Sequence, residues 1–189
     1  MSDGDQGSRL MALAEQVGAR LVARGETVAV AESSAGGLIS AALLSVGGAS
    51  RYFRGGAVVY TKDAKMSFLQ IDEKTATEPR ASTEAHALVL ASNVKKVMGS
   101  TWGVGETGAT GPTGNRYGDA PGHACVAVVG PSGVMPRDER ADTIETGIAD
   151  RPMNMETFAW AALSLLNDMI GLAEGGSKTG TGKHEFRQG

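Results

Sequence analysis

Short apolar runs typical of β-strands alternate with longer segments of helical periodicity along most of this 189-residue chain. Leu10, Leu13, Val17 and Leu21 recur at helical spacing, and the compact β-branched run Thr27–Ala31 follows them. Strands that alternate with helices usually form one sheet with helices packed on both faces. The alternation therefore predicts the α/β class, as a three-layer α/β/α sandwich with a mostly parallel mixed sheet.

Helix and turn signals place the predicted elements along the chain. The predicted helices cover Ser8–Arg24, Leu38–Leu44, Lys62–Leu69, Ser82 or Thr83 to Met98, and Pro152–Leu172. The predicted strands cover Thr27–Ala31, Gly55–Tyr60, Trp102–Glu106, His123–Val129 and Arg137–Thr146, the last as an edge strand with alternating charges. Loops are expected at Asp72–Pro79 and Thr107–Pro121. We predict a single domain over residues 8–172, with a disordered lead at 1–7 and a flexible tail at 173–189.

Composition argues against several classes of protein. The net charge is −3, with no basic stripe, so no nucleic-acid partner is expected. The single cysteine, Cys125, excludes an internal disulfide and a cysteine-based zinc site, and we expect no metal. No apolar run approaches the ~18 residues of a membrane span, and the polar N-terminus is unlike a secretory signal. We therefore expect a cytoplasmic protein with no membrane partner.

Glycine is the unusual residue, with 27 copies among 189 residues, about twice its usual share of ~7%. The glycines cluster in predicted loops, which suggests main chain close to a ligand. In open α/β sheets, ligands bind beyond the carboxyl ends of the strands. Four segments are therefore candidates for one site: the turn after Ala31, the segment after Val59, the loop after Glu106 and the approach to Arg151.

The turn Glu32–Gly37 places Ser33 near a helix N-terminus, where unpaired N–H groups favour negative charge. That position suits a bound phosphate. It equally suits a serine nucleophile whose tetrahedral oxyanion needs hydrogen-bond donors. An ordinary helix-capping serine is the alternative interpretation.

Tyr60 and Lys65 follow the next predicted strand, so both can face the same edge of the sheet. A lysine acts as a base only when it is neutral, so burial or a nearby cation must lower its pKa. The alternative is a solvated lysine beside Lys62 and Asp63, with a tyrosine at the edge of the core.

The segment Thr107–Gly114 combines glycines with hydroxyl groups that can bond phosphate or ribose. It lacks the Gly-Lys-Ser/Thr ending of a Walker A loop and does not match Gly-x-Gly-x-x-Gly. Arg151, at the start of the last predicted helix, can bind a phosphate or carboxylate with two parallel hydrogen bonds. An ion pair with Asp150 or Glu156 is the alternative.

The order of these segments is more specific than any one of them. The motifs are Ala31-Glu32-Ser33-x-x-Gly36-Gly37, Gly55-Gly56-x-x-x-Tyr60-x-x-x-x-Lys65, Thr107-Gly108-x-x-Gly111-Pro112 and Gly147-x-x-x-Arg151. Together they resemble the CinA C-terminal-domain family, whose members include nicotinamide mononucleotide deamidases. The resemblance spans residues 10–172 and is to a stand-alone form of that domain.

The resemblance implies hydrolysis of the nicotinamide carboxamide to nicotinic acid mononucleotide and ammonia, with no metal and no cofactor. It implies a small pyridine nucleotide as the partner and, by analogy, a homo-oligomer. The implied catalytic residues are Ser33, Tyr60 and Lys65. The implied substrate-binding residues are Glu32, Gly36, Gly37, Thr107, Gly108, Gly111 and Arg151.

The resulting hypothesis is that Ser33 attacks the carboxamide carbon while neutral Lys65 takes its proton, directly or through Tyr60. Donors around Gly36 and Gly37 stabilise the oxyanion, and the phosphate lies in the Thr107 loop or against Arg151. Direct attack by water is an alternative mechanism. A nucleotide-binding module without catalysis, and an amidase acting on another amide, are alternative functions.

The chain departs from the family pattern at three places. Ala35 stands where the family usually has threonine, and Ser34 stands where cysteine is frequent. Residues 115–122 replace a Gly-Gly-rich stretch followed by Lys-Pro-Val-Gly. These departures bear on the identity of the substrate more than on the type of reaction.

Overall fold

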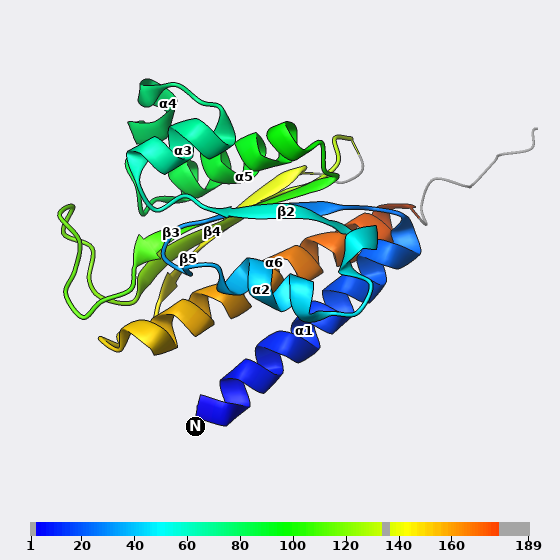
Figure 1. The fold of residues 1–189 in the computed structure, drawn as a ribbon, viewed down its shortest axis with the longest axis horizontal. Coiled ribbons are helices and arrows are strands. Elements are labelled where there is room, and N and C mark those ends of the chain that lie inside the picture. The colour runs from blue at the N-terminus through cyan, green and yellow to red at the C-terminus, as the bar shows by residue number, and fades with distance from the viewer. Residues whose placement is uncertain (1–2, 134–136, 178–189) are drawn as a thin grey trace, which may run out of the picture.

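A five-stranded sheet in the order β2-β1-β3-β4-β5 forms the middle of the computed structural model, which describes residues 3–133 and 137–177 (Figure 1). The strands are β1 (Val28–Glu32), β2 (Phe53–Val58), β3 (Trp102–Ala109), β4 (His123–Val129) and β5 (Glu139–Glu145). β1 pairs in parallel with β2 and with β3, whereas β4 runs antiparallel to β3 and β5. Every strand except β4 therefore points the same way, which confirms the mostly parallel mixed sheet, and β5 is an edge strand as predicted.

Helices cover both faces of this sheet, which confirms the three-layer α/β/α prediction (Figure 1). One face carries α1 (Asp3–Arg24), α2 (Leu38–Ser45) and α6 (Arg151–Ser177). The other carries α3 (Lys62–Leu69), α4 (Glu73–Thr77) and α5 (Glu84–Met98), and a 3-10 turn, η1 (Ala49–Arg51), precedes β2. No helix in the described part of the chain combines the length and the hydrophobicity that crossing a membrane requires.

The strand alternation assigns side chains to the two core layers. Val28 and Val30 of β1 belong to the large cluster under α1, α2 and α6, whereas Ala29 and Ala31 pack with residues of α3 and α5. Gly105 of β3 lets α5 approach closely, since a Cβ there would lie 2.1 Å from the carbonyl oxygen of Ala87. The small residues on this face thus bring the N-terminal part of α5 close to β3.

Several element boundaries differ from the sequence predictions. α1 begins at Asp3, so the lead expected to be disordered joins the helix from that residue. α6 continues to Ser177, past the predicted end at Leu172, and Arg20 of α1 forms an ion pair with Glu174 on this extension. The rest of the expected tail, residues 178–189, lies outside the described residues.

Two further differences have local causes. The expected loop at Asp72–Pro79 contains α4, because the Asp72 side chain accepts a hydrogen bond from the Thr75 amide and caps the helix. β3 continues to Ala109 instead of ending at Glu106, because Ala109 still pairs with His123 of β4. Thr107 and Gly108 therefore lie in a strand and not in a loop.

Candidate active site

The carboxyl ends of β1, β2 and β3 lie side by side. The connections that leave β1 and enter β3 lie on opposite faces of the sheet. β1 leads into α2 on one face of the sheet, whereas the chain enters β3 from α5 on the other face (Figure 1). The register pairs Ala31 with Gly105, and Glu32 with Val58. Ser33, the first residue after β1, thus lies at the topological switch point, where open α/β sheets bind their ligands.

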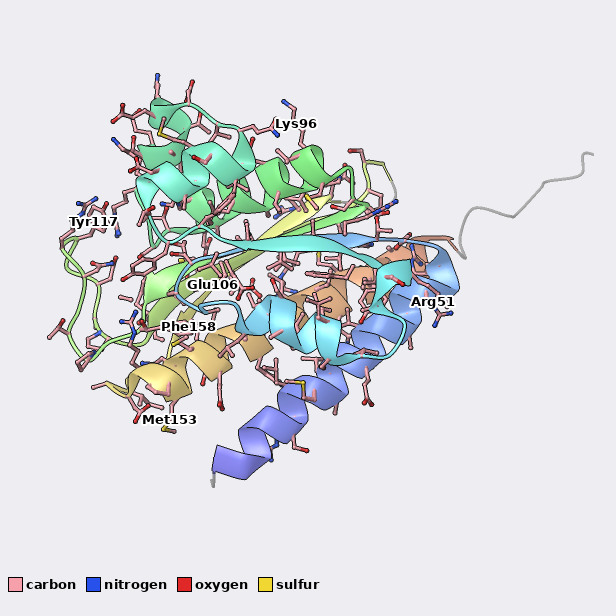
Figure 2. All side chains as sticks on the ribbon, in the orientation of Figure 1. Arg51, Lys96, Glu106, Tyr117, Met153 and Phe158 are labelled. Carbon is pink, nitrogen blue, oxygen red and sulfur yellow. The ribbon has the colours of Figure 1, made fainter. Side chains whose placement is uncertain are left out.

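Glu106 occupies the turn that follows β1. Its carboxylate accepts hydrogen bonds from the Ser33 and Ala35 amides, both at 2.9 Å, and from the Ser34 hydroxyl. The side chain is fully buried between the sheet and α2 (Figure 2). The turn that appeared suited to a phosphate is therefore filled by a carboxylate of the protein itself. Sequence reasoning missed this role, although an acidic residue inside the run Trp102–Ala109 is an unusual feature of a buried strand.

Glu32 has a similar role at the next helix, and its predicted contact with substrate stays a prediction. Its buried carboxylate accepts hydrogen bonds from the amides of Gly37, Ile39 and Ser40, at 2.9–3.1 Å, and from the Ser40 hydroxyl at 2.6 Å. Glu32 thereby satisfies the N–H groups at the start of α2. Those amides are not available to a ligand.

The paired glycines satisfy backbone and packing requirements of the turn. Gly36 and Gly37 have φ values of +67° and +103°, which strongly favour glycine. The Gly36 amide donates to the Ser33 carbonyl, and a Cβ on Gly36 would meet the end of the Met155 side chain at 2.5 Å. The Gly36 and Gly37 amides, which were expected to stabilise the oxyanion, both have acceptors within the protein in this structure.

The three predicted catalytic residues differ in their surroundings. The half-buried Ser33 hydroxyl has no hydrogen-bond partner among residues 3–133 and 137–177. Lys65, on α3, is only 7% exposed, whereas Tyr60 is 61% exposed. Within those same residues, no hydrogen bond joins Ser33, Tyr60 and Lys65 to one another. Burial, with a smaller contribution from the Arg116 charge, lowers the pKa of the Lys65 amine below 10.5, which favours the neutral form that a base requires.

Thr107 and Gly108 pack within the protein. The buried Thr107 hydroxyl accepts a hydrogen bond from the Ser82 amide at 3.1 Å and so ties β3 to the start of α5. A Cβ on Gly108 would lie 2.6 Å from the carbonyl oxygen of His123 on β4. Strand packing thus accounts for a glycine at position 108, and its expected contact with substrate stays a prediction.

Arg151 and Gly111 lie together, but in a structural contact. Arg151 Nη1 donates to the Gly111 carbonyl at 2.9 Å, and Asn154 Nδ2 donates to the neighbouring Thr110 carbonyl at 2.8 Å. Gly111 has φ +100°, and a Cβ there would lie 2.7 Å from the carbonyl oxygen of Ala149. The start of α6 therefore holds the chain that leaves β3, and the expected contact of Arg151 and Gly111 with substrate stays a prediction.

The loop after Gly111 contains the cationic side chain of Arg116, which lies beside Arg80 from the segment before α5. The guanidinium groups of Arg80 and Arg116 lie over the ring of Tyr117, 5.3 and 4.9 Å from its centre. Figure 2 labels Tyr117. Arg80 forms an ion pair with Asp119 at 2.7 Å, whereas Arg116 donates to the Tyr117 hydroxyl. No carboxylate pairs with Arg116 among the described residues, and its charge acts on the Lys65 amine.

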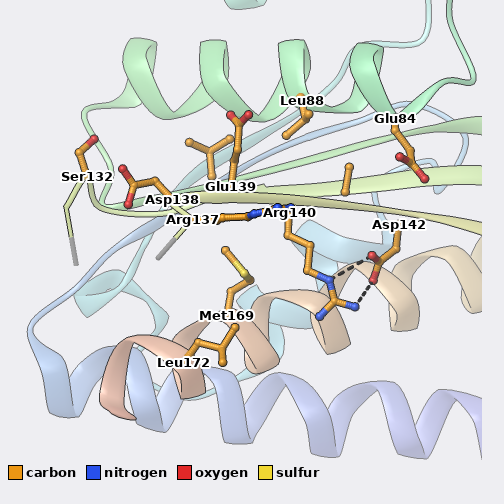
Figure 3. Close-up of a pocket in the computed structure, with 12 residues that line it drawn as sticks. Glu84, Leu88, Ser132, Arg137, Asp138, Glu139, Arg140, Asp142, Met169 and Leu172 are labelled. Carbon is orange, nitrogen blue, oxygen red and sulfur yellow. Dashed lines mark hydrogen bonds and ion pairs between the residues drawn. The ribbon is translucent and has the colours of Figure 1, made fainter. Parts of the chain in front are cut away.

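A separate groove of about 1130 Å³ runs along β5, between α5 and α6 (Figure 3). Met169 and Leu172 of α6 lie on one side of it, and the ion pair between Arg140 and Asp142 lies on the strand. It contains none of the predicted site residues, and it lies at the sheet edge opposite β2. The described residues also contain no group of three or more His, Cys, Asp or Glu side chains able to hold one metal ion.

Replacing Glu106 by glutamine tests the electrostatics of the turn. Burial is the main cause that raises the pKa of Glu106 from 4.5 to about 7. The folded protein therefore keeps a proton that the unfolded chain releases, so stability falls as pH rises from about 4.5 to 7. That pKa difference corresponds to on the order of 3 kcal/mol.

Glutamine preserves the acceptor for the Ser33 and Ala35 amides and donates to the Ser34 hydroxyl, as the protonated acid does. We expect Glu106→Gln to equal the wild type at pH 4.5 and to exceed it by a few kcal/mol at pH 8, measured by urea unfolding. Glu106→Ala is the control, which should lose stability at both pH values because buried donors lose their acceptor. Equal pH dependence in the wild type and Glu106→Gln would contradict the assignment.

The fold and the site define a small α/β/α domain whose polar turn lies at the switch point of its sheet. Residues 10–170 match the family model described as the CinA C-terminal domain, and the chain belongs to this family. It is 38% identical over 121 residues to a CinA-like protein of Salinibacter ruber, covering 64% of this chain and 28% of that protein. The chain thus spans less than a third of the length of this relative.

Solved structures agree with the family. The competence/damage inducible protein CihA of Agrobacterium tumefaciens has a TM-score of 0.77 and 27% identity, over 85% of this chain and 95% of that one. A CinA superfamily protein of Klebsiella pneumoniae has the same TM-score at 22% identity, over 86% and 98% of the two chains, and supports the fold alone.

Proposed function

We propose that this domain is an amidohydrolase that converts nicotinamide mononucleotide to nicotinic acid mononucleotide and ammonia. The observation that supports it best is the almost buried Lys65 amine, whose pKa is lowered. Lys65 lies on α3, which follows β2, and the carboxyl end of β2 lies beside that of β1, where Ser33 leaves the sheet. A serine hydroxyl that has no acceptor in the described structure and an amine that favours its neutral form are the two groups that nucleophilic catalysis of this kind needs. The family resemblance supplies the carboxamide substrate.

In the proposed reaction, the Ser33 oxygen attacks the carboxamide carbon and its proton passes to the neutral Lys65 amine. The Lys65 ammonium then returns a proton to the departing nitrogen, the C–N bond breaks, and ammonia leaves. Water hydrolyses the acyl-enzyme in a second step, with Lys65 again accepting and returning a proton. Tyr60, at the exposed rim, is assigned to contact the substrate or relay the proton.

The oxyanion needs a donor that the protein does not already use. In the turn over residues 33–37, the Ser34 amide is the one N–H with no acceptor in the described part of the chain, since its neighbours donate to Glu106, Ser33 and Glu32. It directly follows the proposed nucleophile. We therefore assign the Ser34 amide, not those of the paired glycines, to the oxyanion.

The substrate phosphate is assigned to Arg116. The amides of the α2 N-terminus are filled by Glu32, and Arg151 donates to the Gly111 carbonyl. Arg116 is exposed, has no carboxylate partner in the described structure and acts electrostatically on Lys65. A guanidinium in this position suits a phosphate bound beside the reacting amide.

A panel of pyridine amides tests the proposal. We expect ammonia release from nicotinamide mononucleotide and much slower release from nicotinamide riboside and nicotinamide, because these two lack the phosphate. Arg116→Met is expected to raise KM for the mononucleotide about 10-fold, the loss of one charge-assisted contact, and to leave KM for nicotinamide unchanged. Binding of the mononucleotide without ammonia release would support a non-catalytic nucleotide-binding module instead.

A further inference from the structure

The strand β5 leaves one edge of the sheet open. It pairs with β4 on one side and, within residues 3–133 and 137–177, with no strand on the other. Its register with β4 is regular over all seven residues, Glu139–Glu145, and the strand contains no proline. A long, regular edge strand is a template for a further strand, and folded proteins usually cover or protect such an edge.

The main-chain groups on the open side of β5 belong to every second residue. The Gly130 amide donates to the Asp138 carbonyl at 2.7 Å, and the Thr146 amide donates to the Gly122 carbonyl at 3.1 Å. Bonded and non-bonded pairs alternate along an antiparallel ladder, so the even-numbered residues of β5 are bonded to β4. The N–H and C=O groups that point to the free edge are therefore those of Glu139, Ala141, Thr143 and Glu145.

Opposite charges flank the middle of this strand. Arg140 and Asp142 point from β5 toward the α6 side of the sheet and form an ion pair at 2.7 Å (Figure 3). Their side chains are 46% and 41% exposed, so both can contact a strand added at the edge. Ala141 lies between them, and its small side chain is on the other face of the sheet.

These charges favour one way of pairing β5 with an identical strand. An antiparallel pair with its two-fold axis at Ala141 places Arg140 of each copy opposite Asp142 of the other, and Glu139 opposite Thr143. Moving the axis by one residue puts Arg140 opposite itself or Asp142 opposite itself. Like charges directly opposite each other destabilise a strand pair, so the axis at Ala141 is preferred.

The helix α6 exposes apolar side chains next to the same edge. Trp160 and Leu172 are both exposed. Trp160 shares a hollow of about 240 Å³ with Asp142 and Ile144 of β5, and Leu172 lines the groove of about 1130 Å³ along that strand. Joining two sheets at β5 brings the two copies of α6 toward each other, which removes apolar surface from water.

We propose that the free edge of β5 pairs antiparallel with β5 of a second copy of this chain, about a two-fold axis at Ala141. The two five-stranded sheets then form one continuous sheet, and the groove along β5 is occupied by a strand of the same sequence. A guanidinium has several N–H donors, so Arg140 can keep its own Asp142 while it contacts that of the second copy. The groove contains none of the predicted site residues, so this inference does not rest on the proposed function.

Reversing the two charges one at a time tests the pairing. Arg140→Asp makes the edge acidic and Asp142→Arg makes it basic, so each variant faces only like charges in its own dimer. We expect the wild type to dimerise in sedimentation equilibrium and each variant to associate at least ~10-fold more weakly. Arg54→Asp, on β2 at the opposite edge of the sheet, is the matched control and should leave the dimer unchanged.

Mixing the two variants separates contacts between copies from the ion pair within each chain. An equimolar mixture should regain a 1:1 dimer in native mass spectrometry, because an acidic edge then faces a basic one. The ion pair within each chain stays broken in this mixture, so its restoration cannot explain the recovery. A mixture that stays monomeric while both variants keep the thermal stability of the wild type would overturn the proposal.

Amide hydrogen exchange of the wild type tests the register. The amides of Glu139, Ala141 and Thr143 should exchange slowly where the dimer forms and quickly after dilution. The Glu145 amide should exchange quickly in both conditions, because it lies opposite residue 137, outside β5. A wild-type chain that is monomeric at millimolar concentration would overturn the proposal. Slow exchange of the same three amides in a monomer would also overturn it, because another segment of the chain would then cover the edge.

Discussion

Replacing Ser33 by alanine is expected to lower ammonia release by ~10³-fold or more, because the nucleophile is lost. The protein should keep its stability, since the Ser33 hydroxyl has no partner among the described residues, and the main-chain bond to Glu106 remains. Turnover is measured by coupled ammonia assay, and stability by thermal unfolding.

The adjacent serine is the matched control for this change. The Ser34 hydroxyl donates to the buried Glu106 carboxylate, so Ser34→Ala should cost on the order of 1 kcal/mol of stability. Its turnover should stay within ~10-fold of the wild type, because the Ser34 amide that we assign to the oxyanion is retained. Near-normal turnover in Ser33→Ala would reject the nucleophile and favour direct attack by water on the amide.

Replacing Lys65 by methionine is expected to lower kcat by ~10²–10⁴-fold, the usual contribution of a positioned general base. Methionine fills a similar space, so the packing of α3 against α5 is preserved. In the wild type, kcat/KM should rise with pH as Lys65 loses its proton, with a midpoint below the ordinary 10.5 because burial lowers that pKa. This limb should be absent from the profile of Lys65→Met.

Lys62→Met is the control on the same helix. Lys62 is exposed and pairs with Glu73, so its loss removes a charge near the site without removing the proposed base. Surface ion pairs contribute little to stability, and both the rate and the pH limb should remain close to those of the wild type. An unchanged pH limb in Lys65→Met would show that another group titrates.

Local patterns were sufficient for most of the fold. Periodicity and β-branched runs depend only on neighbouring residues. They therefore predicted the end of α1 at Arg24 and the start of β1 to within one residue. The outer ends were less predictable. α6 extends to Ser177 beside α1, and Arg20 reaches Glu174 across 154 residues of sequence, a contact that periodicity does not contain.

For the candidate site too, local sequence patterns predicted one part and tertiary contacts determined the other. The motifs predicted that Ser33, Lys65 and Thr107 follow the carboxyl ends of strands, because parallel strands bring those ends to one edge, although Thr107 lies within β3 in the structure. They did not distinguish glycines that a ligand needs from glycines that packing needs. At Gly108 the nearby atom is the His123 carbonyl oxygen, and at Gly111 it is the Ala149 carbonyl oxygen.

The order of residues alone thus established the α/β class, the family resemblance and the edge of the sheet where chemistry is expected, since alternation and turn chemistry are local properties. Tertiary structure decided what fills the turn after β1. Glu106 accepts a hydrogen bond from the Ser33 amide, 73 residues away in the sequence. Its carboxylate thus binds main-chain N–H groups that the local sequence pattern had suggested for a ligand. Such hydrogen bonds depend on which strands become neighbours in the sheet, and the spacing of residues along the sequence does not determine the order of the strands.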